Sequence, residues 1–119
     1  MTIVIIDDEP PVALMLAESL IQEGHTVQAA ATTEDGLNLI RRLSPDAVFL
    51  DIRMPGTSGV EVLRRIRAEW PEMQVIMVTG YAESPEADEC RRLGAIDVVQ
   101  KPTFLTKLGE ALARIHPQR

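Results

Sequence analysis

The sequence predicts an α/β fold, a doubly wound five-stranded parallel sheet with helices on both faces. Short apolar runs alternate along the chain with stretches in which apolar residues recur at helical spacing. The short runs are apolar almost throughout, which is typical of parallel strands buried on both faces. With right-handed crossovers between successive strands, this alternation gives a three-layer arrangement of helices, sheet and helices.

Each element follows from local signals, taken in chain order. The runs rich in β-branched and apolar residues predict five strands, at residues 3–6, 26–30, 46–50, 75–78 and 96–99. Helix-starting and helix-stopping residues mark the helices between them: Pro10-Pro11 and Gly24 for the first, Thr32 or Thr33 for the start of the second, Gly59 and Pro71 for the third, Ser84 and Gly94 for the fourth, and Phe104 to Ile115 for the last.

Composition narrows the function. The 119 residues, 45% of them apolar, are expected to form one domain spanning residues 1–119. The net charge of -6 argues against direct nucleic-acid binding, which depends on Lys and Arg. The single Cys90 excludes an internal disulfide and suits a reducing compartment. No apolar run approaches the roughly 20 residues of a membrane span, and the first run lacks the basic flank of a signal peptide. We therefore expect a cytoplasmic protein that makes no membrane contact.

Polar side chains follow four of the predicted strands. They are Asp7, Asp8 and Glu9 after the first strand, Asp51 after the third, Thr79 after the fourth and Lys101 after the fifth. Each has a structural explanation on its own, as a helix cap, a turn residue or a solvated charge. The carboxyl ends of parallel strands, however, form one rim where ligands bind. One shared site explains these residues better than four coincidences.

An acidic site of this kind requires compensating positive charge. Like unit charges about 4 Å apart repel by about 4 kcal/mol at an effective dielectric constant near 20. Lys101 supplies one positive charge, and Mg2+, which prefers oxygen ligands and water, would supply two more. A carboxylate in such a site can attack a phosphoryl group while the ion and the ammonium neutralise the phosphoryl oxygens. The pattern therefore indicates a divalent metal and phosphoryl chemistry.

Four motifs occur in order over nearly the whole chain: Ile-Ile-Asp-Asp-Glu, Phe-Leu-Asp-Ile-Arg-Met-Pro-Gly-Thr-Ser-Gly, Val-Thr-Gly and Gln-Lys-Pro. In these motifs the chain resembles the receiver domain of two-component response regulators. The resemblance implies a flavodoxin-like sheet with strand order 2-1-3-4-5. It also implies that Asp51 accepts a phosphoryl group from a phosphohistidine of a sensor histidine kinase or phosphotransfer protein. The domain would catalyse only its own phosphorylation and dephosphorylation, so it would not be an enzyme in the ordinary sense.

The resemblance also assigns the remaining site residues. The Mg2+ ligands it implies are Asp7, Asp8, Asp51 and the backbone carbonyl of Arg53. Thr79 would be the switch hydroxyl, Lys101 would bind the phosphoryl group, and the Lys101–Pro102 bond would be cis. Phosphorylation adds roughly -1.5 to -2 charge, and it would reshape the surface of the fourth helix, fifth strand and fifth helix. An unidentified output partner or output domain would recognise that surface, and a phosphorylation-dependent homodimer is compatible with it.

Some positions leave alternatives open. Val98 stands three residues before Lys101, where receivers usually carry Tyr or Phe, and Thr103 stands directly after the Lys-Pro pair, where Phe is common. Tyr81 and Arg53 occupy positions that flank the phosphoryl group in the family. They could shield it from water or simply be exposed. The basic pair at residues 91–92 fits either a charged partner face or a solvated helix face.

Three other functions are alternatives to a phosphorylated switch. A phosphatase with an aspartate nucleophile would resemble Asp-x-Asp-x-Thr after the first strand, where this chain reads Asp-Asp-Glu-Pro-Pro. A flavin-binding electron carrier would need a hydroxyl- or glycine-rich phosphate loop there, and acids would repel the phosphate. The main alternative is a receiver-like interaction module that works without phosphate, although the complete set of site residues counts against it. Whether the domain stands alone or belongs to a larger regulator or hybrid kinase stays open.

Overall fold

The computed structural model describes residues 1–54, 56–80, 82–101 and 104–117 and confirms the predicted architecture. Five parallel strands form one sheet in the order β2-β1-β3-β6-β7, which is the expected 2-1-3-4-5 order of the long strands. The strands of this sheet are β1 (Thr2–Ile6), β2 (Thr26–Ala30), β3 (Ala47–Asp51), β6 (Gln74–Thr79) and β7 (Asp97–Gln100). The helices are α1 (Pro10–Gln22), α2 (Thr33–Leu43), α3 (Gly59–Glu69), α4 (Pro85–Arg92) and α5 (Phe104–Ala113).

A small hairpin between β3 and α3 was not predicted. It pairs β4 (Arg53–Met54) with β5 (Thr57–Ser58) in antiparallel fashion. Gly56 in its turn has a φ of +76°, a conformation that glycine adopts without steric cost. Two-residue strands have too few positions to show an alternating pattern, so the sequence signal for such a hairpin is weak.

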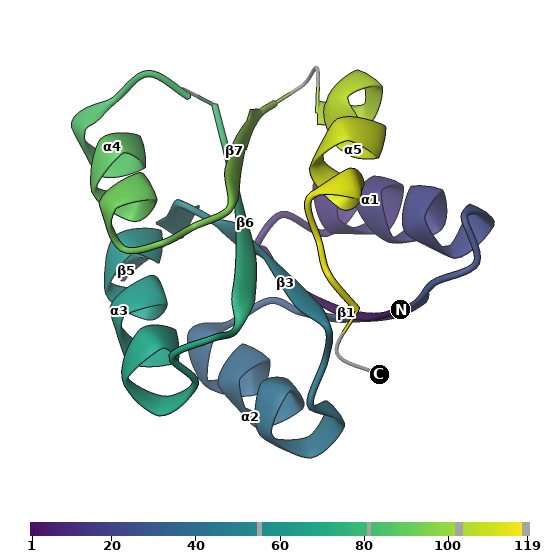
Figure 1. Cartoon of the computed structure of the whole chain (residues 1–119), viewed down its shortest axis with the longest axis horizontal. Helices are drawn as coiled ribbons and strands as arrows, with labels where there is room; N and C mark the ends of the chain where they lie inside the picture. Colours follow the sequence, from purple (N-terminus) through teal and green to yellow (C-terminus); the bar gives the residue numbers. More distant parts are fainter. Residues whose placement is uncertain (55, 81, 102–103, 118–119) are drawn as a thin grey trace.

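The sheet is covered on both faces, with α2, α3 and α4 on one side and α1 and α5 on the other (Figure 1). Because successive side chains of a strand point to opposite faces, each strand contributes to both layers of core. In β1, Val4 and Ile6 pack toward α2, whereas Ile3 and Ile5 pack toward α1. This accounts for strands that are apolar at nearly every position.

Hydroxyl side chains cap three of the four helices whose cap residue the structure describes. Thr32 caps α2, Ser58 caps α3 and Ser84 caps α4, each accepting a hydrogen bond from a backbone N–H of the first turn. The structure thus selects Thr32 from the two predicted caps of α2. At the start of α1, Glu9 holds the cap position, but its side chain makes no capping hydrogen bond. Helix capping therefore does not explain the acids that precede Pro10.

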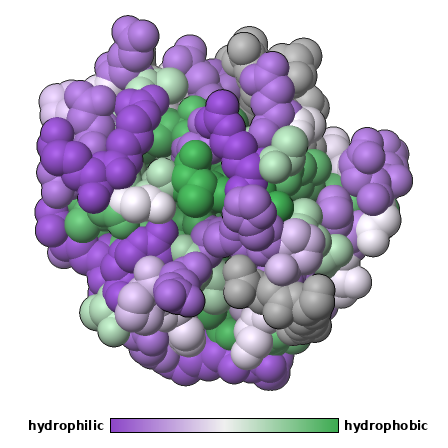
Figure 2. All heavy atoms as spheres, viewed as in Figure 1, coloured by the Kyte–Doolittle hydropathy of each residue, from purple (hydrophilic) through white to green (hydrophobic). Residues whose placement is uncertain are grey.

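Charged side chains cover much of the surface over α3 and α4, on the left of Figure 2, while apolar side chains show between α4 and α5. Arg91 pairs with Asp88 at 3.1 Å and Arg92 pairs with Glu89 at 2.8 Å, both within α4. These internal pairs fit the solvated-face interpretation of the two arginines. None of the helices in the described part of the chain combines the length and apolar character needed to cross a bilayer.

Candidate functional site

The carboxyl end of the sheet gathers carboxylates from two separate parts of the chain. Oxygen atoms of four acidic side chains lie within 4.8 Å of one another, and these residues are Asp7, Asp8, Glu9 and Asp51. Asp7 and Asp51 are almost completely buried, whereas Glu9 is exposed. The predicted convergence of the acids is therefore present in the structure.

One ammonium group lies among these acids. The Nζ atom of Lys101 is 3.1 Å from Oε1 of Glu9 and 3.4 Å from both Asp7 Oδ2 and Asp51 Oδ2. Only 17% of the Lys101 side chain is exposed, so these contacts are partly shielded from water. The sequence pattern places Glu9 among the clustered acids but assigns it no role. The structure places it on Lys101 at the outer side of the pocket.

The end of β1 positions Asp7. Its backbone N–H donates to the Ala30 carbonyl at 3.0 Å, so the pairing of β1 with β2 continues one residue beyond the strand. One carboxylate oxygen, Oδ1, accepts a hydrogen bond of 2.8 Å from the Glu9 N–H. The other, Oδ2, points to Lys101. Asp7 therefore links the strand, the turn before α1 and the lysine.

Asp51 is the last residue of β3, and its side chain is held from two sides. Its Oδ1 accepts the Arg53 backbone N–H at 3.1 Å, and its Oδ2 lies near Lys101. Gly59 begins α3 directly against this strand end. A Cβ at Gly59 would lie 2.5 Å from the Asp51 carbonyl oxygen and 2.5 Å from the Ile52 Cα, so only glycine fits there.

Thr79 and Lys101 come from the two strands beyond β3. Asp51 pairs in register with Val78, the residue before Thr79, and Thr79 is buried at the end of β6. The Thr79 carbonyl accepts the Lys101 backbone N–H at 2.7 Å. The acid, the hydroxyl and the amine therefore stand at the ends of three neighbouring strands.

The pocket perturbs the acid–base behaviour of its groups. Burial, with a contribution from the charge of Asp7, raises the pKa of Asp51 from 3.8 to about 6, although the Arg53 N–H and Lys101 oppose the shift. Burial alone would lower the pKa of Lys101, but the hydrogen bond with Glu9 and the charges of Asp51 and Asp7 raise it. The lysine therefore stays positively charged, whereas burial disfavours the ionised form of Asp51.

The donor set fits a hard cation. Asp8 Oδ1 is buried and accepts no hydrogen bond from the described residues, which is costly for a charged oxygen. It belongs to the same group of oxygens as Asp7 and Asp51. Oxygen ligands are those that Mg2+ prefers in proteins. The Arg53 backbone lies beside this group, because its N–H binds Asp51.

Of the residues predicted to flank the phosphoryl group, Arg53 turns its side chain toward α4, and Tyr81 lies outside the described residues. The Arg53 guanidinium, on a side chain that is 67% exposed, binds Glu86 of α4 at 2.9 Å. This contact was not predicted, since nothing in the spacing of residues 53 and 86 indicates it. Tyr81, Pro102 and Thr103 lie outside the described residues, and with them the predicted Tyr81 shield and the Lys101–Pro102 bond.

The family model of the response regulator receiver domain matches residues 3–113. The chain belongs to this family. The match covers all the site residues described above and the main sheet except the first residue of β1, so the resemblance seen in the four motifs is confirmed.

Solved structures agree with this membership. The chain is similar to FixJ-N, with 34% identity over 95% of this chain and 90% of that one, at a TM-score of 0.85. It is similar to the response regulator TrrA of Thermotoga maritima, solved in complex with Mg2+-BeF, with 31% identity over 95% and 96% of the two chains and a TM-score of 0.84. The chemotaxis protein CheY4 of Vibrio cholerae shares the fold at a TM-score of 0.88, with 24% identity over 97% and 98%.

Proposed function

We propose that this receiver domain is a phosphorylation-controlled switch in which Asp51 accepts a phosphoryl group from the phosphohistidine of a sensor kinase or phosphotransfer protein. One observation carries the proposal. The buried Asp51 carboxylate lies 3.4 Å from the Lys101 ammonium, inside a group of carboxylate oxygens that are within 4.8 Å of one another. The whole of residues 1–119 would serve as this one domain.

The transfer is a displacement at phosphorus. A carboxylate oxygen of Asp51 attacks the phosphorus atom, the P–N bond of the phosphohistidine breaks, and its electron pair returns to the imidazole. The product is an acyl phosphate on Asp51, and attack by water releases phosphate and restores the carboxylate. Lys101 neutralises a phosphoryl oxygen during transfer, and the Thr79 hydroxyl binds another oxygen of the product.

Mg2+ would be held by the predicted ligands Asp7, Asp8, Asp51 and the backbone carbonyl of Arg53. When bound, the ion neutralises charge that develops on the phosphoryl oxygens. The buried Asp8 Oδ1 accepts no hydrogen bond from the part of the chain that the structure describes, and this supports the assignment, because a cation would satisfy that oxygen.

The phosphoryl group is then read as a change of surface. Thr79 ends β6 and Lys101 follows β7, so a group that draws both side chains toward Asp51 pulls on the loops leading into α4 and α5. The resulting change in the α4–β7–α5 surface would be recognised by an output partner or output domain. Such a module turns over no substrate other than its own phosphoryl group.

Mapping of phosphate after incubation with phosphoramidate and Mg2+ tests the proposal. We expect one phosphoryl group per chain, on Asp51, and none on the Asp51→Asn variant. Asp35→Asn, at an exposed acid in the first turn of α2, is the matched control and should be phosphorylated normally. Phosphate on another residue, or no phosphate on the wild-type protein, would refute the assignment. Turnover of an external phosphoester such as p-nitrophenyl phosphate would favour a phosphatase instead.

A further inference from the structure

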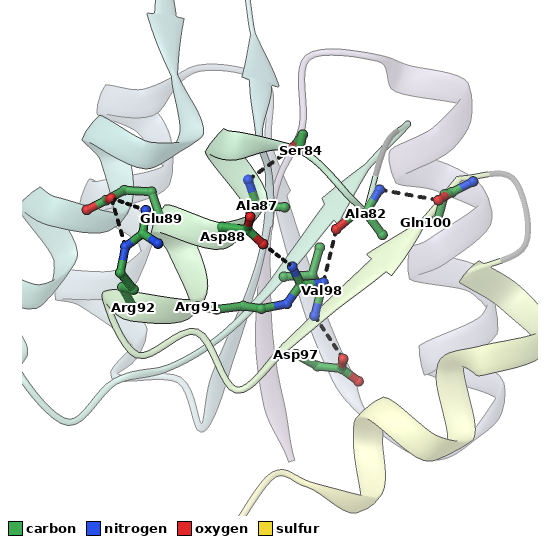
Figure 3. A network of polar contacts seen from close by, with 10 residues as sticks. All are labelled: Ala82, Ser84, Ala87, Asp88, Glu89, Arg91, Arg92, Asp97, Val98 and Gln100. Atoms are coloured by element: carbon green, nitrogen blue, oxygen red, sulfur yellow. Dashed lines mark hydrogen bonds and ion pairs between the residues drawn. The ribbon is translucent and has the colours of Figure 1, made fainter.

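The loop between β6 and α4 is held from two sides at one residue. Ala82 lies three positions after Thr79. Its N–H donates to Oε1 of Gln100 at the end of β7, at 3.2 Å. Its carbonyl accepts a hydrogen bond of 3.0 Å from Nη2 of Arg91, in the last turn of α4 (Figure 3). Ala82 therefore ties the loop after Thr79 to both the helix and the strand of the expected output surface.

Arg91 is oriented for this contact. Its Nη1 pairs with Asp88 Oδ1, one turn earlier in α4, at 3.1 Å. In Figure 3 its side chain runs from α4 toward the Ala82 carbonyl and passes in front of Val98. Ala82 also packs against the core cluster that contains Val98 and Cys90. The guanidinium, which is held at both ends, thus connects the helix to a loop residue that is anchored in the core.

The Val98 side chain is poorly suited to convey movement of this loop to the protein surface. It is 8% exposed, it is part of the core cluster, and its side chain has neither a ring nor a polar group. Arg91, by contrast, is a long polar side chain that is 45% exposed and bonded directly to the loop backbone. Of the two residues, only Arg91 joins the loop to the surface of α4.

We infer that Arg91 is a latch that holds the β6–α4 loop in its unphosphorylated position and conveys loop movement to the surface of α4. This inference rests on the proposed function. Movement of Thr79 toward a phosphoryl group on Asp51 displaces the residues that follow it. The Arg91–Ala82 hydrogen bond then breaks, and the guanidinium is released to the α4–β7 surface. The latch therefore favours the resting state, and its removal should ease switching.

Beryllofluoride with Mg2+, which imitates a bound phosphoryl group, provides the test. If the latch contributes one ordinary net hydrogen bond, Arg91→Ala should bind beryllofluoride about two- to ten-fold more tightly than the wild-type chain. Arg92→Ala is the matched control, because Arg92 is the next residue of α4 and pairs with Glu89 of the same helix. It should bind beryllofluoride with wild-type affinity.

A second readout separates a latch from general support of α4. In NMR spectra of the ligand-free proteins, the Ala82 amide of Arg91→Ala should shift toward its position in beryllofluoride-bound wild type, whereas that of Arg92→Ala should not. Equal affinities for Arg91→Ala and wild type, weaker binding by Arg91→Ala, or an unshifted Ala82 amide would overturn the latch alone. Failure of the wild-type chain to bind beryllofluoride would overturn the proposed function and the latch with it.

Discussion

Buried polar groups are hydrogen-bonded to the backbone at the amino end of the sheet, whereas buried carboxylates are crowded around one lysine at the carboxyl end. At the amino end, the buried Gln74 side chain donates to the Asp46 and His116 carbonyls at 3.0 and 2.6 Å and accepts the His116 N–H at 2.7 Å. Asp46 in turn accepts the Thr2 N–H at 2.8 Å. At the carboxyl end, Asp7 and Asp51 share the single ammonium of Lys101.

The difference shows what each end contributes. Hydrogen-bonded polar groups at the amino end join the first residues, the start of β6 and the segment after α5, so they stabilise the fold. Crowded carboxylates at the carboxyl end destabilise the protein unless a ligand supplies positive charge. Stability is therefore expected to depend on substitutions at the amino end and on ligands at the carboxyl end.

The largest change in the free energy of unfolding is expected for Gln74→Ala at the amino end. The substitution removes the three hydrogen bonds that the Gln74 side chain makes, and it should lower the free energy of unfolding by about 2–4 kcal/mol. Urea denaturation measures the change. Gln28→Ala, at an exposed position of the edge strand β2, is the control and should change stability by less than about 0.5 kcal/mol. Equal effects of the two variants would contradict the role given to Gln74.

Asp51→Asn, at the carboxyl end, is expected to raise the free energy of unfolding of the metal-free protein. The pKa of Asp51 is raised from 3.8 to about 6, so its ionisation is less favourable in the folded than in the unfolded chain. Its contribution to stability is fully present below about pH 4 and is lost as the pH rises through about 6. The variant should therefore be more stable than wild type at pH 7.5, by roughly 2–3 kcal/mol.

Urea denaturation in EDTA at pH values between 4 and 8 tests the Asp51 prediction. The wild-type chain should lose stability relative to Asp51→Asn across the interval from about pH 4 to 6, and the difference should be constant above it. A difference that is independent of pH, or a variant less stable than wild type at pH 7.5, would show that the carboxylate is not under strain.

The last comparison concerns a thiol in the core, away from both ends of the sheet, and its rate of alkylation rather than the stability of the protein. Burial, aided by the charge of Glu89, raises the pKa of Cys90 to about 11. The native protein should therefore react with iodoacetamide at pH 8 far more slowly than the urea-unfolded chain, since the thiolate is the reactive form. Mass spectrometry measures the two rates. A fast reaction in the native state would mean that α4 opens readily and exposes the Cys90 thiol.

Sequence patterns predicted the sheet and the convergence of the acids, because apolar strands buried on both faces and residues at strand ends leave direct patterns. The strand order followed only from the resemblance to the receiver family. It could not predict contacts made by long side chains. The bonds from Arg53 to Glu86 and from Arg91 to Ala82 join residues whose spacing carries no periodic signal. The same holds for the Gln74 contacts, which depend on where the chain returns after α5.

The most direct test of the account is thermal unfolding with and without Mg2+. An ion at 100 times its dissociation constant stabilises the native state by about 2.7 kcal/mol, which should raise the melting temperature of the wild-type chain by on the order of 10 °C. Asp8→Ala removes the acid whose buried oxygen has no hydrogen-bond partner among the described residues, and it should abolish the rise, while Asp35→Ala should keep it. An equal rise in wild type and Asp8→Ala, or no rise in wild type, would contradict the account.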